Sequence, residues 1–233
     1  MKKSLIALAV AAALVPSLAM AEAGDIVVRL RATHISADES SKLGSQTHDT
    51  YAGALDGVIG APAQLRVDNN TIPEIDFSYY VTKNIALELI LATGTRHDVK
   101  AINTVAGAGG DVPLGSVNLL PPTLTAQWHF NPDQTIDPYV GAGVSYVRAM
   151  DRSLTLPVAG GVPIHIERNS FGPAIQAGVD YNLPDSKWLV NLDVKKIWFN
   201  TDVTLNYNNT GYKKIDSLDV DPWVVSVGIG RKF

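Results

Sequence analysis

The sequence predicts an all-β protein, an eight-stranded antiparallel transmembrane β-barrel with short periplasmic turns and long extracellular loops. Three observations predict this fold. Apolar and polar residues alternate with a period of two through most of the chain, as they do in strands that have one face in lipid. The connections between these segments alternate between short and long, and the chain ends in an alternating strand whose last residue is Phe233.

The first 21 residues have the features of a secretory signal peptide. Lys2 and Lys3 precede a short apolar run at 5–15, and Ala-Met-Ala at 19–21 fits a cleavage site. We therefore expect a signal peptide at 1–21 and an outer-membrane β-barrel at 22–233, located in the bacterial cell outer membrane after cleavage. No later apolar run reaches the roughly 18 residues of a transmembrane helix.

Composition narrows the function classes. The chain has 233 residues, a formal net charge of -4 and no cysteine, so a disulfide framework is excluded. The acidic balance and the lack of a basic stripe argue against a nucleic-acid partner. A closed barrel supplies stability in another way, because it leaves no strand edge unpaired.

The predicted strands follow one another along the chain at about 25–36, 71–81, 85–92, 116–130, 139–150, 170–181, from 188 and 223–233. The connections are short at 82–84, 131–137 and 182–187, and long at 37–70, 100–115, 151–169 and about 208–214. This asymmetry is typical of short periplasmic turns and long external loops. Five aromatic residues lie next to the short turns, where a membrane girdle is expected: Trp128, Phe130, Tyr181, Trp188 and Phe233.

Six blocks, in order along the chain, carry a family resemblance. They include Asn-Ile-Ala-Leu-Glu-Leu at 84–89, Leu-Pro-Pro-Thr at 120–123, Pro-Tyr-Val-Gly-Ala-Gly-Val at 138–144 and Val-Asp-Pro-Trp at 220–223, besides 24–29 and 178–181. Through these blocks the chain resembles the OmpW family of small outer-membrane β-barrel proteins, of the OmpW/AlkL-like type. The resemblance implies a narrow lumen, blocked toward the periplasm, through which small hydrophobic molecules enter from outside and leave sideways into the membrane. Segments 42–66 and 151–168 do not match the family residue by residue.

The predicted inward faces carry many ionisable residues. A small barrel has little more room than its own side chains need, and an unpaired charge there has a desolvation penalty of several kcal/mol. We therefore expect an interior ionic plug, mutually paired rather than reactive, that closes the periplasmic half. Its expected members are Arg29, Arg31, Glu74, Asp76, Glu88, Asp180, Asp193 and Lys195.

Nearer the external end the same inward register becomes apolar at Ile35, Ile197 and Phe199. An apolar cavity there would bind small molecules by burial of their surface, at about 25 cal/mol per Å²; the alternative is a hydrophobic filler without a cavity. Pro121 and Pro122 fall within a predicted strand although they lack the N–H that a ladder uses. They mark either a lateral exit to the lipid or a bulge.

An enzyme is not expected. The five histidines show no paired metal-ligand spacing, and the chain has neither Gly-x-Ser-x-Gly nor a glycine-rich phosphate loop. The fragments His-Asp at 48–49 and Arg-His-Asp at 96–98 are expected on solvated rims. We expect no metal and no cofactor.

The sequence thus favours an outer-membrane channel for passive uptake of small hydrophobic molecules, with lateral release into the membrane. Its expected partners are outer-membrane lipid and small hydrophobic solutes, with no nucleic acid. The alternative is a structural or receptor barrel with a closed lumen, whose external loops bind extracellular ligands such as bacteriocins, phage or host surfaces.

Overall fold

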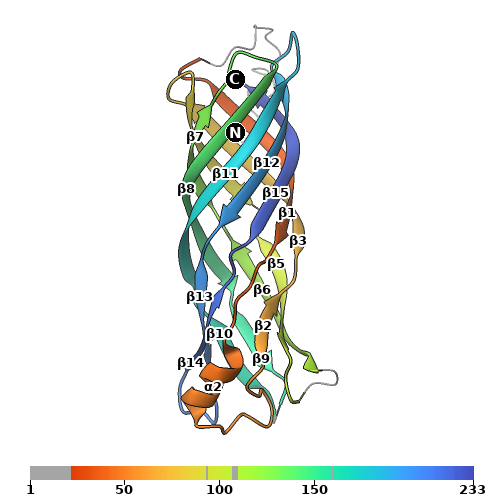
Figure 1. Cartoon of the computed structure of the whole chain (residues 1–233), viewed down its shortest axis with the longest axis vertical. Coiled ribbons are helices and arrows are strands. Elements are labelled where there is room, and N and C mark those ends of the chain that lie inside the picture. The colour runs from red at the N-terminus through yellow and green to blue at the C-terminus, as the bar shows by residue number, and fades with distance from the viewer. Residues whose placement is uncertain (1–21, 93, 107–109, 159) are drawn as a thin grey trace, which may run out of the picture.

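Eight antiparallel strands close into a barrel in the computed structural model, which describes residues 22–92, 94–106, 110–158 and 160–233 (Figure 1). The predicted signal peptide lies outside the described residues. Around the barrel the strands are β1 (Ile26–Ser36), β3 (Asn70–Tyr80), β4 (Ile85–Ala92), β7 (Thr123–His129), β8 (Ile136–Asp151), β11 (Asn169–Asn182), β12 (Trp188–Ile197) and β15 (Trp223–Lys232). Pairing of β15 with β1, from Val27–Lys232 to Ser36–Trp223, closes the cylinder. The predicted fold class is confirmed.

The outer face of the barrel is apolar, because each strand turns every second residue outward. Along β15, for example, Val225, Val227 and Ile229 are exposed, whereas Val224 and Ser226, which alternate with them, are buried. The predicted girdle residues, Trp128, Phe130, Tyr181, Trp188 and Phe233, are all exposed beside the short turns. This outer surface suits lipid, with its aromatic rings at the level of the headgroups.

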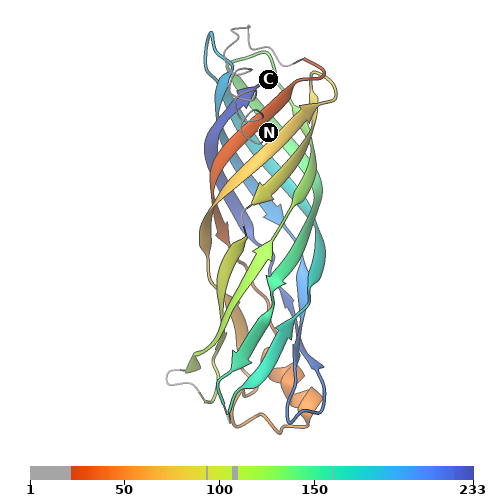
Figure 2. The same cartoon turned by 180° about the vertical axis from the view of Figure 1, so that it is seen from behind.

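The long external connections contain further strands, which the sequence pattern did not predict. β2 (Gln64–Val67), β5 (Thr95–Ile102) and β6 (Val112–Leu120) continue the barrel wall beyond the end of β8. A second sheet has the order β14 (Lys213–Asp219), β13 (Asn200–Leu205), β10 (Val162–Ile166) and β9 (Ser153–Leu156). Together with the helix α2 (Leu43–Tyr51), they form an extension that the barrel carries on its long-loop end (Figure 2).

Predicting one strand at 116–130 was wrong, because two strands occupy this segment. β6 ends at Leu120 and β7 begins at Thr123, with Pro121 and Pro122 between them. β7 pairs with β4 and β8 in the barrel, whereas β6 pairs with β5 in the extension and touches β8 only through Asn118–Leu120. Neither proline has an N–H to donate to a ladder, and the strand breaks there.

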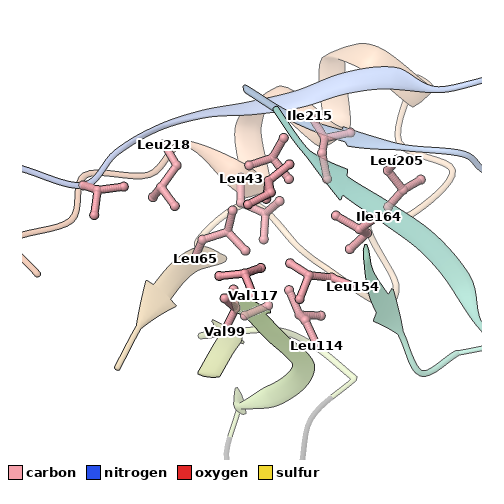
Figure 3. Close-up of a cluster of buried hydrophobic side chains, with 14 of the residues drawn as sticks. Leu43, Leu65, Val99, Leu114, Val117, Leu154, Ile164, Leu205, Ile215 and Leu218 are labelled. Carbon is pink, nitrogen blue, oxygen red and sulfur yellow. The ribbon is translucent and has the colours of Figure 1, made fainter. Parts of the chain in front are cut away.

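The extension has a hydrophobic core of its own between its two sheets (Figure 3). Its side chains come from every long connection: Leu43 from α2, Leu65 from β2, Val117 from β6, Ile164 from β10 and Ile215 from β14, each at most 3% exposed. Tyr51 of α2 also donates a hydrogen bond of 2.5 Å to the backbone oxygen of Leu205. Among the described residues no helix is long and apolar enough to cross a membrane.

Candidate functional site

Charged side chains occupy the lumen in the half of the barrel that adjoins the short turns. Arg29 is fully buried and bonds to two other strands at once: its Nη1 lies 3.0 Å from Asp76 Oδ1 and 2.7 Å from Ser78 Oγ, and its Nη2 lies 2.6 Å from Asp180 Oδ2. The residue reaches across the barrel from β1 to β11, because β15 and β12 separate these two strands in the barrel wall. Opposite walls are thereby held together by charge-assisted hydrogen bonds.

Arg31 repeats this arrangement two residues further along β1. Its Nε and Nη2 lie 2.7 Å and 2.6 Å from Glu74 Oε1, and the Nε is 3.0 Å from Asp76 Oδ2. The Nη2 is also 3.5 Å from Glu88 Oε1. Glu88 in turn accepts hydrogen bonds from Gln176 at 2.8 Å and from Thr125 at 3.1 Å. The two guanidinium groups therefore share a connected set of carboxylates.

All eight residues proposed from sequence as the ionic plug are buried, at 5% exposure or less. The structure joins seven of them through the two arginines or through shared neighbours: Arg29, Arg31, Glu74, Asp76, Glu88, Asp180 and Asp193. Lys195 lies at the external edge, where its Nζ is 3.4 Å from Asp193 Oδ1. We call this set the ionic network.

Sequence reasoning placed His129 on the inward face but missed Tyr139 and Asp137, which complete the network toward the short turns. Tyr139 donates a hydrogen bond of 2.9 Å to Asp193 and accepts one of 3.0 Å from Asn191. His129 Nδ1 lies 2.7 Å from Asp137 Oδ2. A signal exists in the sequence, because Asp137 and Tyr139 have the same parity as the inward glycines of β8, but the turn residues at 131–137 mask it.

One cluster within the network has the residue types of a metal site. Ligand atoms of His129, Asp137 and Asp180 all lie within 4.8 Å of one another. Protein donors already occupy both carboxylates, because Arg29 and Asn191 bind Asp180 and the backbone N–H of Asn131 binds Asp137. This cluster is accounted for as part of the ionic network.

An apolar cavity, which we call the lower cavity, adjoins the ionic network on the side that faces the extension. The extension is at the bottom of Figures 1 and 2, and we call the direction toward it upward because it is the external end. The lower cavity contains four of the five residues proposed from sequence for a hydrophobic lumen or exit, namely Ile35, Pro121, Ile197 and Phe199. Other aliphatic residues complete the wall: Ile72, Ile90, Ala92, Leu119, Val147, Val220 and Val224. Six polar residues also line it, of which Glu74 and Lys195 belong to the ionic network: Thr33, Glu74, Thr95, His97, Thr123 and Lys195. The fifth candidate, Pro122, does not line the cavity.

His97 also lines the lower cavity, so its expected place on a solvated rim was wrong. It is 6% exposed, and its Nδ1 lies 2.9 Å from the backbone oxygen of Asp68. The alternation of β5 explains this position, since Thr95, His97 and Val99 all turn inward while Arg96 and Asp98 are exposed. The ring contributes to a cavity wall and is held by a backbone carbonyl.

The barrel wall is interrupted beside the lower cavity. The β4–β7 ladder ends at the pair Ile90–Thr123, and the β5–β6 ladder begins at Thr95–Leu119. Among the described residues no ladder pair joins the two, and this stretch contains Pro121 and Pro122. On the other side the wall is continuous, since Tyr146 of β8 donates a backbone hydrogen bond of 2.9 Å to Pro122.

A second apolar cavity, the upper cavity, lies between the two sheets of the extension. It shares five lining residues with the lower cavity: Val67, Leu119, Val147, Phe199 and Val220. Phe199, 9% exposed, stands between the two. The extension therefore carries the apolar interior of the barrel outward beyond the ends of the barrel strands.

Outside the membrane-spanning segments, two histidines have shifted pKa values. A hydrogen bond of 2.8 Å with Asp56 and the charge of that carboxylate raise the pKa of His48, which is exposed on α2. Partial burial, followed by the nearby charge of Arg152, lowers the pKa of His165 on β10. His48 therefore belongs to an exposed ion pair, on the solvated side of the extension as the sequence predicted.

Known proteins share both the sequence and the architecture. Residues 22–233 match the model of the OmpW family. The chain belongs to the OmpW family. Outer membrane protein W of Escherichia coli is 36% identical over 203 residues, which cover 86% of this chain and 90% of the relative.

Solved structures of OmpW-type barrels have the same fold. The crystal structure of outer membrane protein OprG from Pseudomonas aeruginosa is 26% identical, with a TM-score of 0.71, and the match covers 93% of this chain and 99% of OprG. The solid-state NMR structure of outer membrane protein AlkL in lipid bilayers is also 26% identical, with a TM-score of 0.66 and 91% of each chain covered. This OmpW-family protein is therefore an outer-membrane β-barrel.

Proposed function

We propose that this OmpW-family protein is a passive channel through which small hydrophobic molecules enter the outer membrane from outside and leave sideways into the lipid. The observation that carries the proposal is the apolar lower cavity, which lies above the ionic network and beside the interrupted wall. Apolar walls bind apolar solutes by removing their surface from water. The resemblance to the OmpW family implies the same class of solute.

The route begins in the extension and passes Phe199 into the lower cavity. Further descent is opposed by the ionic network, because an apolar solute would have to separate Arg29 and Arg31 from buried carboxylates, and each separated charge costs several kcal/mol. The remaining direction is sideways, toward Pro121 and Pro122, where Ala92 and Pro121 line the cavity and Leu91 is exposed on the outer surface. No chemical step and no cofactor enter this proposal.

The test is uptake of naphthalene by cells in which deletion of the protein lowers uptake. Ile197→Asp and Phe199→Asp should each reduce uptake about tenfold at unchanged surface amount, because a carboxylate in an apolar passage retains water and disfavours the solute. Val105→Asp is the matched control, since Val105 is 61% exposed and lines neither cavity. Phe199→Trp should also slow uptake, by filling the passage.

The side exit has its own variant. Changing Pro121 and Pro122 together to valine supplies two N–H donors and should slow uptake without changing solute binding. Pro113→Val is the control, at an exposed proline of β6 away from the cavities. Wild-type uptake by all the cavity variants would reject the channel and favour the alternative, a receptor or structural barrel.

A further inference from the structure

Lys195 is a buried cation at the boundary between the ionic network and the lower cavity. It lies on β12, is 2% exposed and lines the cavity with its neighbour in register, Val224. Two residues further along the same face, Ile197 belongs to the apolar wall. The ammonium therefore lies at the end of the cavity that meets the ionic network, where it would contact one end of an elongated molecule bound there.

This ammonium has few partners within the part of the chain that the structure describes. Its Nζ makes one ion pair, 3.4 Å from Asp193 Oδ1, and its charge also acts on the buried carboxylate of Glu88, but it donates no hydrogen bond to any described residue. A lysine ammonium has three N–H donors. The adjacent Lys196, on the opposite face of β12, gives the contrast: it donates to the backbone oxygen of Asp221 at 2.6 Å and to Asp38 at 3.2 Å, and it lies over the Trp223 ring.

The hydroxyl groups where the cavity meets the ionic network do not accept hydrogen bonds from Lys195. Thr33 is bonded to Ser226 at 2.8 Å, and Thr123 to Ser145 at 2.9 Å. Beyond them the cavity wall is apolar except for Thr95 and His97, which are bonded to the backbone oxygens of Leu119 and Asp68. Lys195 thus has donor capacity that neither the network nor the cavity wall uses, and an acceptor atom on a bound solute would use it.

The charge of the surroundings selects the kind of acceptor. The ionic network has more carboxylates than cations, since Glu74, Asp76, Glu88, Asp180 and Asp193 face Arg29, Arg31 and Lys195. A carboxylate solute would add a further negative charge to this set. An uncharged oxygen accepts a hydrogen bond from an ammonium without that repulsion, and hydrogen bonds to charged groups are the stronger ones.

We propose that Lys195 is the head-group site of the lower cavity, which takes uncharged oxygenated amphiphiles of the medium-chain alkanol class. The hydroxyl oxygen accepts a hydrogen bond from Lys195 Nζ, and the alkyl chain lies along Ile35, Ile197 and Phe199. This inference rests on the proposed function and adds a preference to it: an alkanol binds more tightly than the alkane of the same length.

Binding can be measured by NMR on the full barrel in lipid nanodiscs, with labelled isoleucine methyl groups to report on Ile35 and Ile197. In the wild type, 1-octanol should bind about tenfold more tightly than n-octane, the effect of one hydrogen bond to a charged group. Lys195→Met keeps the length of the side chain and should remove that tenfold preference. Lys196→Met is the matched control and should keep the preference.

Three results would overturn the head-group site: an unchanged octanol preference in Lys195→Met, equal affinity of the wild type for octanol and octane, or tighter binding of octanoate than of octanol. Because Lys195→Met leaves Asp193 without its cation and can fail to fold, the wild-type protein labelled at the lysine ε-carbon provides a second measurement. Octanol, but not octane, should shift the Lys195 signal, and no shift would equally reject the site. Failure of the channel itself is separate, since then neither solute would move the isoleucine methyl groups.

Discussion

The two halves of the barrel interior are built on the same eight strands and differ in the side chains that face inward. Toward the short turns, β1 presents Arg29 and Arg31. Both bond to the neighbouring strand β3, and Arg29 also bonds across the lumen to β11. Toward the extension the same face of β1 presents Ile35, which lines an apolar cavity. The outer face stays apolar in both halves. Membrane insertion and lumen chemistry are therefore carried by alternate residues of one strand and can vary independently.

The halves also differ in how fully they are packed. In the polar half, glycines make room for large side chains: a Cβ at Gly178 would collide with the Tyr139 ring, and one at Gly230 would lie 2.8 Å from Arg29 Cγ. In the apolar half, branched aliphatic side chains leave a cavity. The polar half is therefore packed closed, whereas the apolar half contains a cavity. The substitutions below test this difference.

The largest effect is expected from Arg29→Ala. It removes the cation that bonds Asp76 and Asp180 and leaves buried carboxylates unpaired, so the free energy of unfolding should fall by about 3 kcal/mol or more. Urea unfolding of the refolded barrel in lipid vesicles measures it. Arg96→Ala, at an exposed arginine of β5, is the control and should change little. An unchanged midpoint for Arg29→Ala would mean that water, rather than paired charge, fills this half.

The second test compares an isoleucine in the packed core of the extension with one at the lower cavity. Ile164→Ala should cost about 3 kcal/mol, because it opens a new cavity among tightly packed side chains. Ile197→Ala should cost about 2 kcal/mol, because space already adjoins this side chain and mainly the transfer term of its three lost carbons remains. The same urea titration gives both values. Equal losses would indicate that the lower cavity is packed shut.

A third change adds volume to each half. Gly178→Ala should destabilise the barrel by about 2 kcal/mol, since the new methyl group displaces Tyr139 from Asp193 and would lie only 2.7 Å from the backbone oxygen of Leu192. Ala92→Val adds two methyl groups at the wall of the lower cavity and should change stability by less than about 1 kcal/mol. Thermal unfolding measured by circular dichroism compares the stabilities of the two variants. A larger loss for Ala92→Val than for Gly178→Ala would contradict the assignment of a packed polar half and an apolar half with a cavity.

The smallest effect is expected for the exposed ion pair of His48 and Asp56, which serves as a solvent-exposed comparison for the buried ionic network. Because Asp56 raises the pKa of His48, this pair stabilises the folded protein below the ordinary histidine pKa, and the contribution is lost as the pH rises through the raised value. In Asp56→Asn the pKa of His48 should return toward about 6.5. An NMR titration of the His48 ring protons measures it, and an unchanged pKa would mean that Asp56 is not the cause.

Local sequence determined most of the barrel strands, the lipid-facing side and the inward ionisable residues. Strand alternation has a strict period of two, so the inward placement of Arg29 and Lys195 follows once the outward Leu30 and Val194 are recognised. The short connections could be read in the same way, because turn residues act over a few positions. Asp137 was missed only because it adjoins such a turn.

The tertiary structure alone decided what the long connections do and which inward residues meet. β2, β9, β10 and β13 have only four to six residues, and each is stabilised by a sheet that no single segment can predict. The same holds for the contact of Arg29 with Asp180, and for a cavity that joins Ile35, Pro121 and Phe199 from three strand ends. Alternation gives the face of a residue, but register, shear and packing across the lumen determine its neighbours.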